Sequence, residues 1–215
     1  MRIGILGSGE VGRALGKGFI KHGHEVMLSG RDLEKKELKE WLKETARAQA
    51  GTYADAAKFG EVIILTVRGS IVNEVIKLAG PQNLSRKTVI DTTNPIADKP
   101  PVNGVLVYLT GPNESLGEQI QAAIPAAKVV KAFNSVGSPL MVNPEFSQGT
   151  PTMFLCGDDA AAKAQVSGIL REFGWEPLDC GNITSSRAIE PLCMLWCIPG
   201  FLNNQWRHAF KLLTK

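Results

Sequence analysis

The chain has 215 residues, 44% of them hydrophobic, which suits one domain of ordinary size with enough apolar material for its own core. Its 24 basic and 21 acidic residues give a net charge of +3 and are scattered along the sequence, which argues against a nucleic-acid partner. The four cysteines lack a CxxC or any paired spacing, so the sequence predicts reduced thiols and no metal site.

Neither end of the chain predicts a membrane partner. The opening MRIGILGSG is too short an apolar run for a signal peptide, because glycines interrupt it at once. The late apolar run Leu192–Leu202 contains Pro199 and Gly200 and is shorter than a membrane span. We therefore expect a soluble protein located in the cytoplasm.

Apolar runs and amphipathic segments alternate through the first half of the chain, which is typical of a βαβ arrangement. Each apolar run is continuous, as expected where helices cover both faces of a parallel sheet. The predicted strands are Arg2–Leu6, Glu25–Leu28, a short one near Thr52, Val62–Val67 and Thr88–Asp91, and the predicted helices are Val11–His22, Asp32–Ala48, one from Ala54, and Ser70–Ala79.

The second half follows a loop rich in proline and asparagine, Asn94–Asn103. We expect a helix from Ser115, strands at Lys128–Ala132, Thr152–Cys156 and Glu176–Leu178, a helix at Asp159–Phe173, and a helix at Ser185–Leu213 broken at Pro199. The prediction is an α/β fold of the doubly wound Rossmann type with a parallel sheet. Residues 1–182 would form this α/β domain and residues 183–215 a short helical C-terminal extension packed on it.

A glycine-rich motif lies where the first strand ends and the first helix begins, and this context makes a GxGxxG pattern specific for dinucleotides. Gly7 permits a tight turn, Gly9 lets a pyrophosphate approach the backbone, and Gly12 lets the helix pack closely on the strand. The helix start offers free N–H groups and a positive dipole end to the phosphates. The predicted pyrophosphate loop is Gly7, Ser8, Gly9, Glu10, Val11 and Gly12.

The end of the second strand favours NADP(H) over NAD(H). An NAD-preferring domain places a carboxylate there, whereas this chain has Ser29, Gly30 and Arg31. A hydroxyl, a backbone N–H and a guanidinium suit a 2′-phosphate, and Lys35 adds a second charge. The alternative for Arg31 is an ordinary solvated surface charge.

Residues after the next two strands should line the same crevice, because ligands of open α/β sheets bind at the carboxyl ends of strands. They are Thr66, Val67 and Arg68 after one strand and Thr92, Thr93, Asn94 and Pro95 after the next. Arg68 has two open interpretations, a contact with the nucleotide or an exposed charge.

The chain resembles the NADP oxidoreductase family that reduces a deazaflavin coenzyme, a domain also found in the cytosolic part of six-transmembrane metalloreductases. The resemblance covers nearly the whole length and rests on the blocks GILGSGEVGRALG, HEVMLSGRD, KVVKAFNSVG, LCGDD, GWEPLDCG and SSRAIEPL. It implies NADPH at the glycine loop, with Ser8, Gly9, Glu10 and Val11 at the pyrophosphate and Ser29, Gly30, Arg31 and Lys35 at the 2′-phosphate.

Two blocks depart from the deazaflavin reductases. Asn134 stands where those enzymes carry a histidine, as in the metalloreductase pattern, and Val67, Arg68 and Gly69 replace a proline and a tryptophan. The resemblance therefore leaves the acceptor open between a flavin, a deazaflavin and another small molecule.

Contacts with the nicotinamide or acceptor are expected from the block after Lys128. Asn134 and Ser135 are the first candidates, Lys131 and Phe133 the next, and Ala132 joins Asn134 on the cofactor side. The alternative is that Lys131 and Asn134 only brace the loop.

The last predicted helix adds two further expectations. Arg187 and Glu190, at helical spacing, should pair with each other. Trp196, Phe201 and Trp206 suit core packing, and the alternatives are an acceptor wall or a dimer contact.

Three functions remain open. The first is an NADPH-dependent reductase that transfers hydride to a small, diffusible electron acceptor, which needs no general acid if the acceptor is a flavin or deazaflavin. The second is a non-catalytic NADP(H)-binding redox sensor. The third is a hydroxyacid or imine dehydrogenase completed by a partner subunit. The apolar final helix predicts a homodimer.

Overall fold

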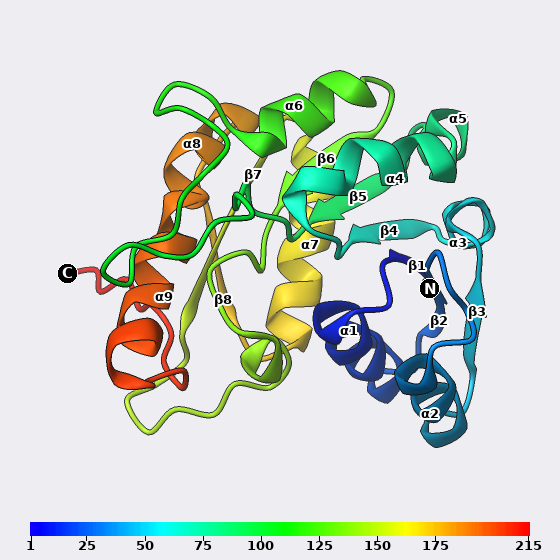
Figure 1. The fold of residues 1–215 in the computed structure, drawn as a ribbon, viewed down its shortest axis with the longest axis horizontal. Coiled ribbons are helices and arrows are strands. Elements are labelled where there is room, and N and C mark those ends of the chain that lie inside the picture. The colour runs from blue at the N-terminus through cyan, green and yellow to red at the C-terminus, as the bar shows by residue number, and fades with distance from the viewer.

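The computed structural model describes residues 1–215 and contains one eight-stranded sheet in the order β3-β2-β1-β4-β5-β6-β7-β8 (Figure 1). This order confirms the predicted Rossmann-type α/β fold, because the chain changes direction across the sheet between β1 and β4. The strands are β1 (Arg2–Leu6), β2 (Glu25–Ser29), β3 (Ala48–Gly51), β4 (Val62–Leu65), β5 (Thr88–Asp91), β6 (Lys128–Lys131), β7 (Thr152–Gly157) and β8 (Glu176–Asp179).

One joint in the sheet departs from the parallel arrangement. β7 runs antiparallel to β6 and pairs with it only through Val130 with Gly157 and Lys131 with Cys156. The long connection between these strands contains a single 3₁₀ turn, η2 (Ser138–Leu140), and no crossover helix. A parallel return would need such a crossover, so the antiparallel direction follows from the connection.

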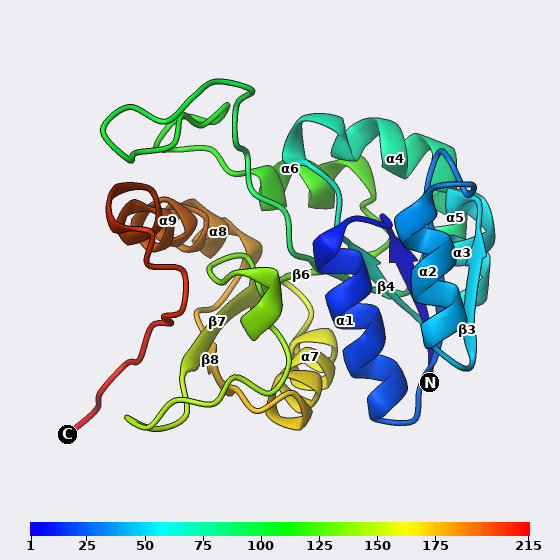
Figure 2. The same cartoon turned by 60° about the horizontal axis from the view of Figure 1, so that its bottom comes forward.

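Helices cover both faces of the sheet, and each face has its own hydrophobic core (Figure 2). β4 alternates between them: Val62 and Ile64 belong to a 25-residue cluster, and Ile63 and Leu65 to a 20-residue cluster. The larger cluster includes side chains of α1 (Glu10–Lys21), α2 (Lys36–Glu44) and α7 (Ala160–Glu172). The smaller cluster includes side chains of α3 (Tyr53–Phe59), α4 (Val72–Ala79), α5 (Pro81–Leu84), α6 (Leu116–Ala123) and α8 (Ser186–Ile189). The chain also contains two other 3₁₀ turns, η1 (Gly69–Ile71) and η3 (Ile183–Ser185).

The charged segment after β2 is less helical than predicted. Asp32 accepts a hydrogen bond from the Glu34 N–H at 2.9 Å, which forms a local turn, and α2 begins only at Lys36. The helix ends before Arg47, whose φ of 67° is left-handed. Ala48 belongs to β3 and not to the helix.

The C-terminal helix α9 (Pro191–Asn203) passes through Pro199, so the predicted break there is wrong. The helix ends because Asn204 adopts a left-handed φ of 53°, and residues 204–215 contain no regular element. α9 lies beside the loop after β5, where Leu106 packs with Cys193, Trp196 and Cys197 (Figure 2).

All four cysteines are free thiols in this arrangement. None of the helices combines the length and the apolar character needed to cross a bilayer.

Candidate functional site

The turn between β1 and α1 has the geometry of a pyrophosphate loop. Gly7 has a φ of 136°, and a Cβ at this residue would lie 2.5 Å from the Oγ1 atom of Thr66. A Cβ at Gly12 would lie 2.3 Å from the Gly7 carbonyl oxygen. A Cβ at Gly9, in contrast, would meet no atom within 4 Å, so this backbone borders open space. The loop is packed tightly on the protein side and is open on the side where a phosphate would approach.

The start of α1 leaves its donors available to a ligand. Gly9 is the N-cap and supplies no side-chain cap. The first N–H groups of a helix have no partner within the helix, and the dipole makes this end positive. The Arg13 guanidinium donates to the Ser8 carbonyl at 2.7 Å, which holds the loop against α1.

The end of β2 presents exposed cations. Arg31 and Lys35 are both exposed, and the nearest carboxylate to the Arg31 guanidinium, that of Glu74, is 4.0 Å away. Ser29 differs from the prediction: it is fully buried and its hydroxyl donates to the Ile5 carbonyl at 2.9 Å. Since that hydroxyl faces β1, a 2′-phosphate would be bound by Gly30, Arg31 and Lys35 instead.

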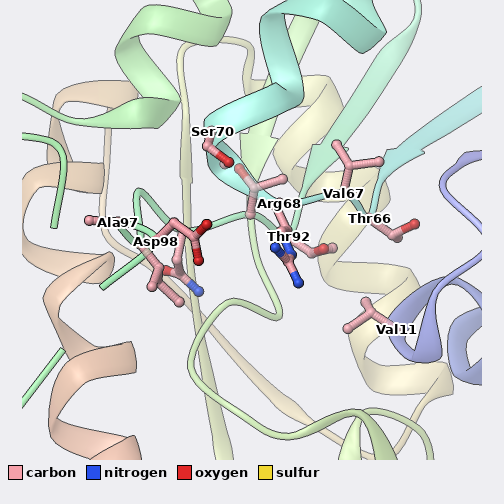
Figure 3. Close-up of a pocket in the computed structure, with 12 residues that line it drawn as sticks. Val11, Thr66, Val67, Arg68, Ser70, Thr92, Ala97 and Asp98 are labelled. Atoms are coloured by element: carbon pink, nitrogen blue, oxygen red, sulfur yellow. The ribbon is translucent and has the colours of Figure 1, made fainter. Parts of the chain in front are cut away.

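A first cavity of about 360 Å³, the nucleotide cavity, lies at the carboxyl ends of β4 and β5 (Figure 3). Val11 at the start of α1 lies on one side, and Ala97 and Asp98 lie on the other (Figure 3). Arg68 lines the cavity and forms no ion pair, so its charge is available. The lining residues are Val11, Thr66, Val67, Arg68, Gly69, Ser70, Thr92, Thr93, Asn94, Ile96, Ala97 and Asp98.

The strand-end rule predicted half of this lining. Gly69, Ser70, Ile96, Ala97 and Asp98 were missed, although each directly extends a segment that the rule had selected. Their positions depend on how the two loops fold back over the sheet, which a strand-end rule does not describe.

A second cavity of about 510 Å³, the aromatic cavity, shares Val11 with the first. Residues 136–140 after β6 form one wall, and Trp196 of α9 with Trp206 and Arg207 forms another. The two indole rings lie 5.7 Å apart at an angle of 47°. The remaining lining residue is Glu10, at the start of α1.

Lys131, at the end of β6, lies in a buried ion network. Its ammonium contacts Asp91 at 2.6 Å and Glu190 at 2.8 Å and donates to the Thr93 carbonyl at 2.9 Å. Burial opposes the charged form, but the Asp91 and Glu190 carboxylates outweigh burial and raise the pKa of Lys131. Since all three ammonium donors are engaged, Lys131 has none to offer an acceptor. It positions the surrounding loops.

Glu190 connects this network to the C-terminal helices. Its carboxylate accepts hydrogen bonds from the backbone N–H groups of Leu116 at 3.0 Å and Gly117 at 2.8 Å, in the first turn of α6. The predicted pair of Arg187 with Glu190 is therefore wrong. Arg187 donates to Glu118 at 2.7 and 2.9 Å, and this contact lowers the pKa of the Glu118 carboxyl.

Asn94 and Asn134 bridge the ends of β5 and β6. Asn94 donates to the Asn134 carbonyl at 2.9 Å, and the Asn134 amide donates to the Asn94 side chain at 3.1 Å and to the Ile189 carbonyl at 3.0 Å. The Oδ1 atom of Asn134 is buried and has no partner. Asn134, Ser135 and Ala132 are all buried and line neither cavity, so contacts of these residues with a ligand stay predictions.

Phe133 is the most unusual residue of this turn. It is fully buried and has a left-handed φ of 62°, a conformation that is rare for bulky side chains. The turn directs residues 136–140 toward the aromatic cavity.

Comparisons with known proteins bear on this arrangement. The family model for NADP oxidoreductase, coenzyme F420-dependent, matches residues 2–95. The F420-dependent NADP reductase of Methanocaldococcus jannaschii is 30% identical over 214 residues, which cover 91% of this chain and 90% of that protein. The metalloreductase STEAP3 of Rattus norvegicus is 30% identical over 211 residues, and the match spans 94% of this chain but only 39% of that longer protein.

Solved structures give the same picture. A structure from Arthrobacter sp. FB24, described as a candidate F420-dependent NADP reductase, superposes with a TM-score of 0.93 at 32% identity and covers 99% of both chains. An imine reductase from Aspergillus terreus superposes with a TM-score of 0.67 at 16% identity, and the match covers 94% of this chain and 63% of that one. The second likeness concerns the fold alone.

Proposed function

Because the chain belongs to the family of coenzyme F420-dependent NADP oxidoreductases, and is thus an NADP(H)-dependent oxidoreductase, we propose that it reduces a planar acceptor of the flavin or deazaflavin type with NADPH. NADPH occupies the glycine loop and the nucleotide cavity, and the acceptor occupies the aromatic cavity. The single observation that carries this proposal is that the two cavities meet at Val11.

The residues present fit an NADP(H) molecule. The open space at Gly9 admits the pyrophosphate, and the uncapped start of α1 binds it. Arg31 and Lys35 bind the 2′-phosphate with charge-assisted hydrogen bonds. No carboxylate follows β2 directly to repel this phosphate, since Arg31 occupies that region and Asp32 is turned into the local turn with Glu34.

The nucleotide cavity holds the nicotinamide half of the cofactor. In a sheet with this strand order the dinucleotide lies across the switch between β1 and β4, with one half on each side. The adenosine half lies at the end of β2, so the nicotinamide half lies at the ends of β4 and β5. Asn134 does not line this cavity but bonds to Asn94, which does, and its unpartnered Oδ1 is the acceptor that we assign to a carboxamide N–H.

When bound, the nicotinamide supplies the hydride. The protein aligns the two ring systems and excludes water from between them. Val11 and residues 136–140 present mostly apolar surface to the acceptor ring, and the indoles of Trp196 and Trp206 cover its other side. Glu10 and Arg207 are the only ionisable residues of this cavity, so binding and orientation are its main contribution.

The test is NADPH oxidation by the purified protein, followed optically with flavins, the deazaflavin coenzyme and ferric chelates as acceptors. Turnover with a flavin or deazaflavin supports the proposal. Tight NADPH binding without turnover by any acceptor contradicts it and assigns the chain a sensing role.

The cofactor preference has its own test. Replacing Arg31 with alanine should weaken NADPH binding about tenfold and leave NADH binding nearly unchanged, as measured by calorimetry. Lys39→Ala is the matched control, because Lys39 pairs with Glu34 on the same segment. An equal loss for both nucleotides in the Arg31 variant would refute the assignment of the 2′-phosphate site.

A further inference from the structure

Residues 204–215, here called the C-terminal strap, turn back from the end of α9 and cross the aromatic cavity. The left-handed Asn204 makes the reversal, and the N–H groups of Asn204 and Gln205 donate to the carbonyls of Gly200 and Pro199. Trp206 and Arg207 follow directly and line the cavity. In Figure 2 the strap, drawn in red, leaves the end of α9 and continues as an extended segment to the C-terminus.

The side chain of Trp206 packs tightly against α9. A Cβ at Gly200 would lie 2.3 Å from the indole ring, so the ring rests directly on the α9 backbone. Phe201 contacts the Trp206 ring edge-on, with ring centroids 5.2 Å apart. The Nε1 atom of Trp206 donates to the Asn204 side chain at 3.1 Å. This indole is thus held in position before any acceptor arrives.

The rest of the strap is anchored on the sheet. Trp196 donates to the His208 carbonyl at 2.8 Å, the His208 ring lies 2.9 Å from the Trp196 carbonyl oxygen, and the two rings stack 5.0 Å apart. Thr152 of β7 donates to the Phe210 carbonyl at 2.8 Å. Lys211 pairs with Glu176 of β8. Anchors on α9, β7 and β8 therefore fix Trp206 and Arg207 over the cavity.

Arg207 is exposed, forms no ion pair and is the only cation that lines the aromatic cavity. We propose that Trp206 and Arg207 determine acceptor specificity: Trp206 covers the face of a planar heteroaromatic ring, and Arg207 binds an anionic group, a phosphate or carboxylate, carried by that ring. A guanidinium suits both anions because it binds them with two parallel hydrogen bonds. This inference rests on the proposed function.

The test compares ligands that share a ring but differ in the anion. FMN and riboflavin form one pair, and the deazaflavin coenzyme and its chromophore without the phosphate-bearing chain form the other. Calorimetric Kd values and KM values in NADPH-driven turnover are measured for the full chain and for Arg207→Gln. We expect the variant to lose about tenfold in affinity for the anionic member of the preferred pair and nothing for the neutral member.

Two further variants complete the experiment. Trp206→Leu should weaken both members of a pair equally, because it changes only the surface that covers the ring. Arg171→Gln, which removes another exposed and unpaired arginine on α7, should change neither. The ligand pair with the larger Arg207-dependent difference identifies the source of the anion.

The outcomes separate the two proposals. Suppose that the wild-type chain turns over an acceptor, but Arg207→Gln changes the affinities for the anionic and the neutral ligand equally or not at all. This result overturns the inference about Arg207 and leaves the proposed function standing. If the wild-type chain neither binds nor reduces any of the four compounds, both proposals fail.

Discussion

The two cavities that meet at Val11 are assembled in different ways. The nucleotide cavity comes from short segments that directly follow β4 and β5 and from the start of α1. The aromatic cavity combines the loop after β6 with α9 and the C-terminal strap, segments about 60 residues apart in the chain. The first is a property of the doubly wound sheet itself, whereas the second depends on how the C-terminal helices are fastened to that sheet.

The buried network of Asp91, Lys131 and Glu190 connects the C-terminal helices to the sheet. Removing its cation should give the largest loss of stability. Lys131→Met leaves two buried carboxylates without their partner, which should lower the free energy of unfolding by about 3–5 kcal/mol in urea denaturation. Lys128→Met, on the same strand but at the surface beside Asp159, is the control. Comparable losses in the two variants would show that the network does not fasten the C-terminal helices.

Gly9→Ala tests the nucleotide side without disturbing the packing. A Cβ there meets no protein atom but enters the space proposed for the pyrophosphate, so NADPH affinity should fall at least about tenfold. The loss of a favourable N-cap glycine should lower Tm by no more than about 3 °C. Gly168→Ala, equally open but on α7, should leave NADPH binding unchanged. Unaltered NADPH affinity in Gly9→Ala would argue against this loop as the phosphate site.

Asn134 lines neither cavity but bonds to Asn94 of the nucleotide cavity, and a cofactor analogue can test whether it also contacts the nicotinamide. An NADP analogue with an acetyl group in place of the carboxamide lacks the N–H donors that the Asn134 Oδ1 would accept. The wild-type chain should therefore bind it several-fold more weakly, about 1 kcal/mol, and Asn134→Ala should abolish this difference. A difference that persists in the variant assigns Asn134 only to bracing the loop.

The smallest effect should come from Arg187, which contacts Glu118 at the surface. Its side chain is 39% exposed, and such pairs contribute little. Arg187→Ala should change Tm by less than about 2 °C, in clear contrast to Lys131→Met. A larger shift in a thermal scan would mean that the surface pair, and not Glu190 alone, holds α8 to α6.

The sequence predicted the parts that follow from local rules. The glycine loop and the positions after β4 and β5 depend on residues close together in the chain, and the Rossmann fold class follows from the alternation of strands and helices along it. Ser29 shows the limit of such rules. Its position at the end of β2 was predicted, but the hydrogen bond from its hydroxyl to the Ile5 carbonyl was not. Rotamer choice of this kind depends on packing between strands, which no single segment encodes.

The acceptor side was less predictable because its contacts cross the whole chain. Arg187 and Glu190 are at pairing distance in a helix, yet each finds a partner from α6 or β6 that no helical spacing reveals. The end of α9 likewise depended on Asn204 and not on Pro199. Trp206 was a candidate wall residue, but only the reversal at Asn204 brings it and Arg207 to the aromatic cavity.

The narrow joint between β6 and β7 has a consequence for how the molecule opens. Only two residue pairs join these strands, whereas β1 pairs with β2 through five. Cooperative opening units tend to separate where backbone pairing is sparse. Amide hydrogen exchange should therefore divide the chain into two blocks at this joint, with β7, β8 and α7 exchanging together and earlier than β1, β4 and β5. The strap is anchored on the faster block, so acceptor affinity would report on local opening that leaves the nucleotide side intact.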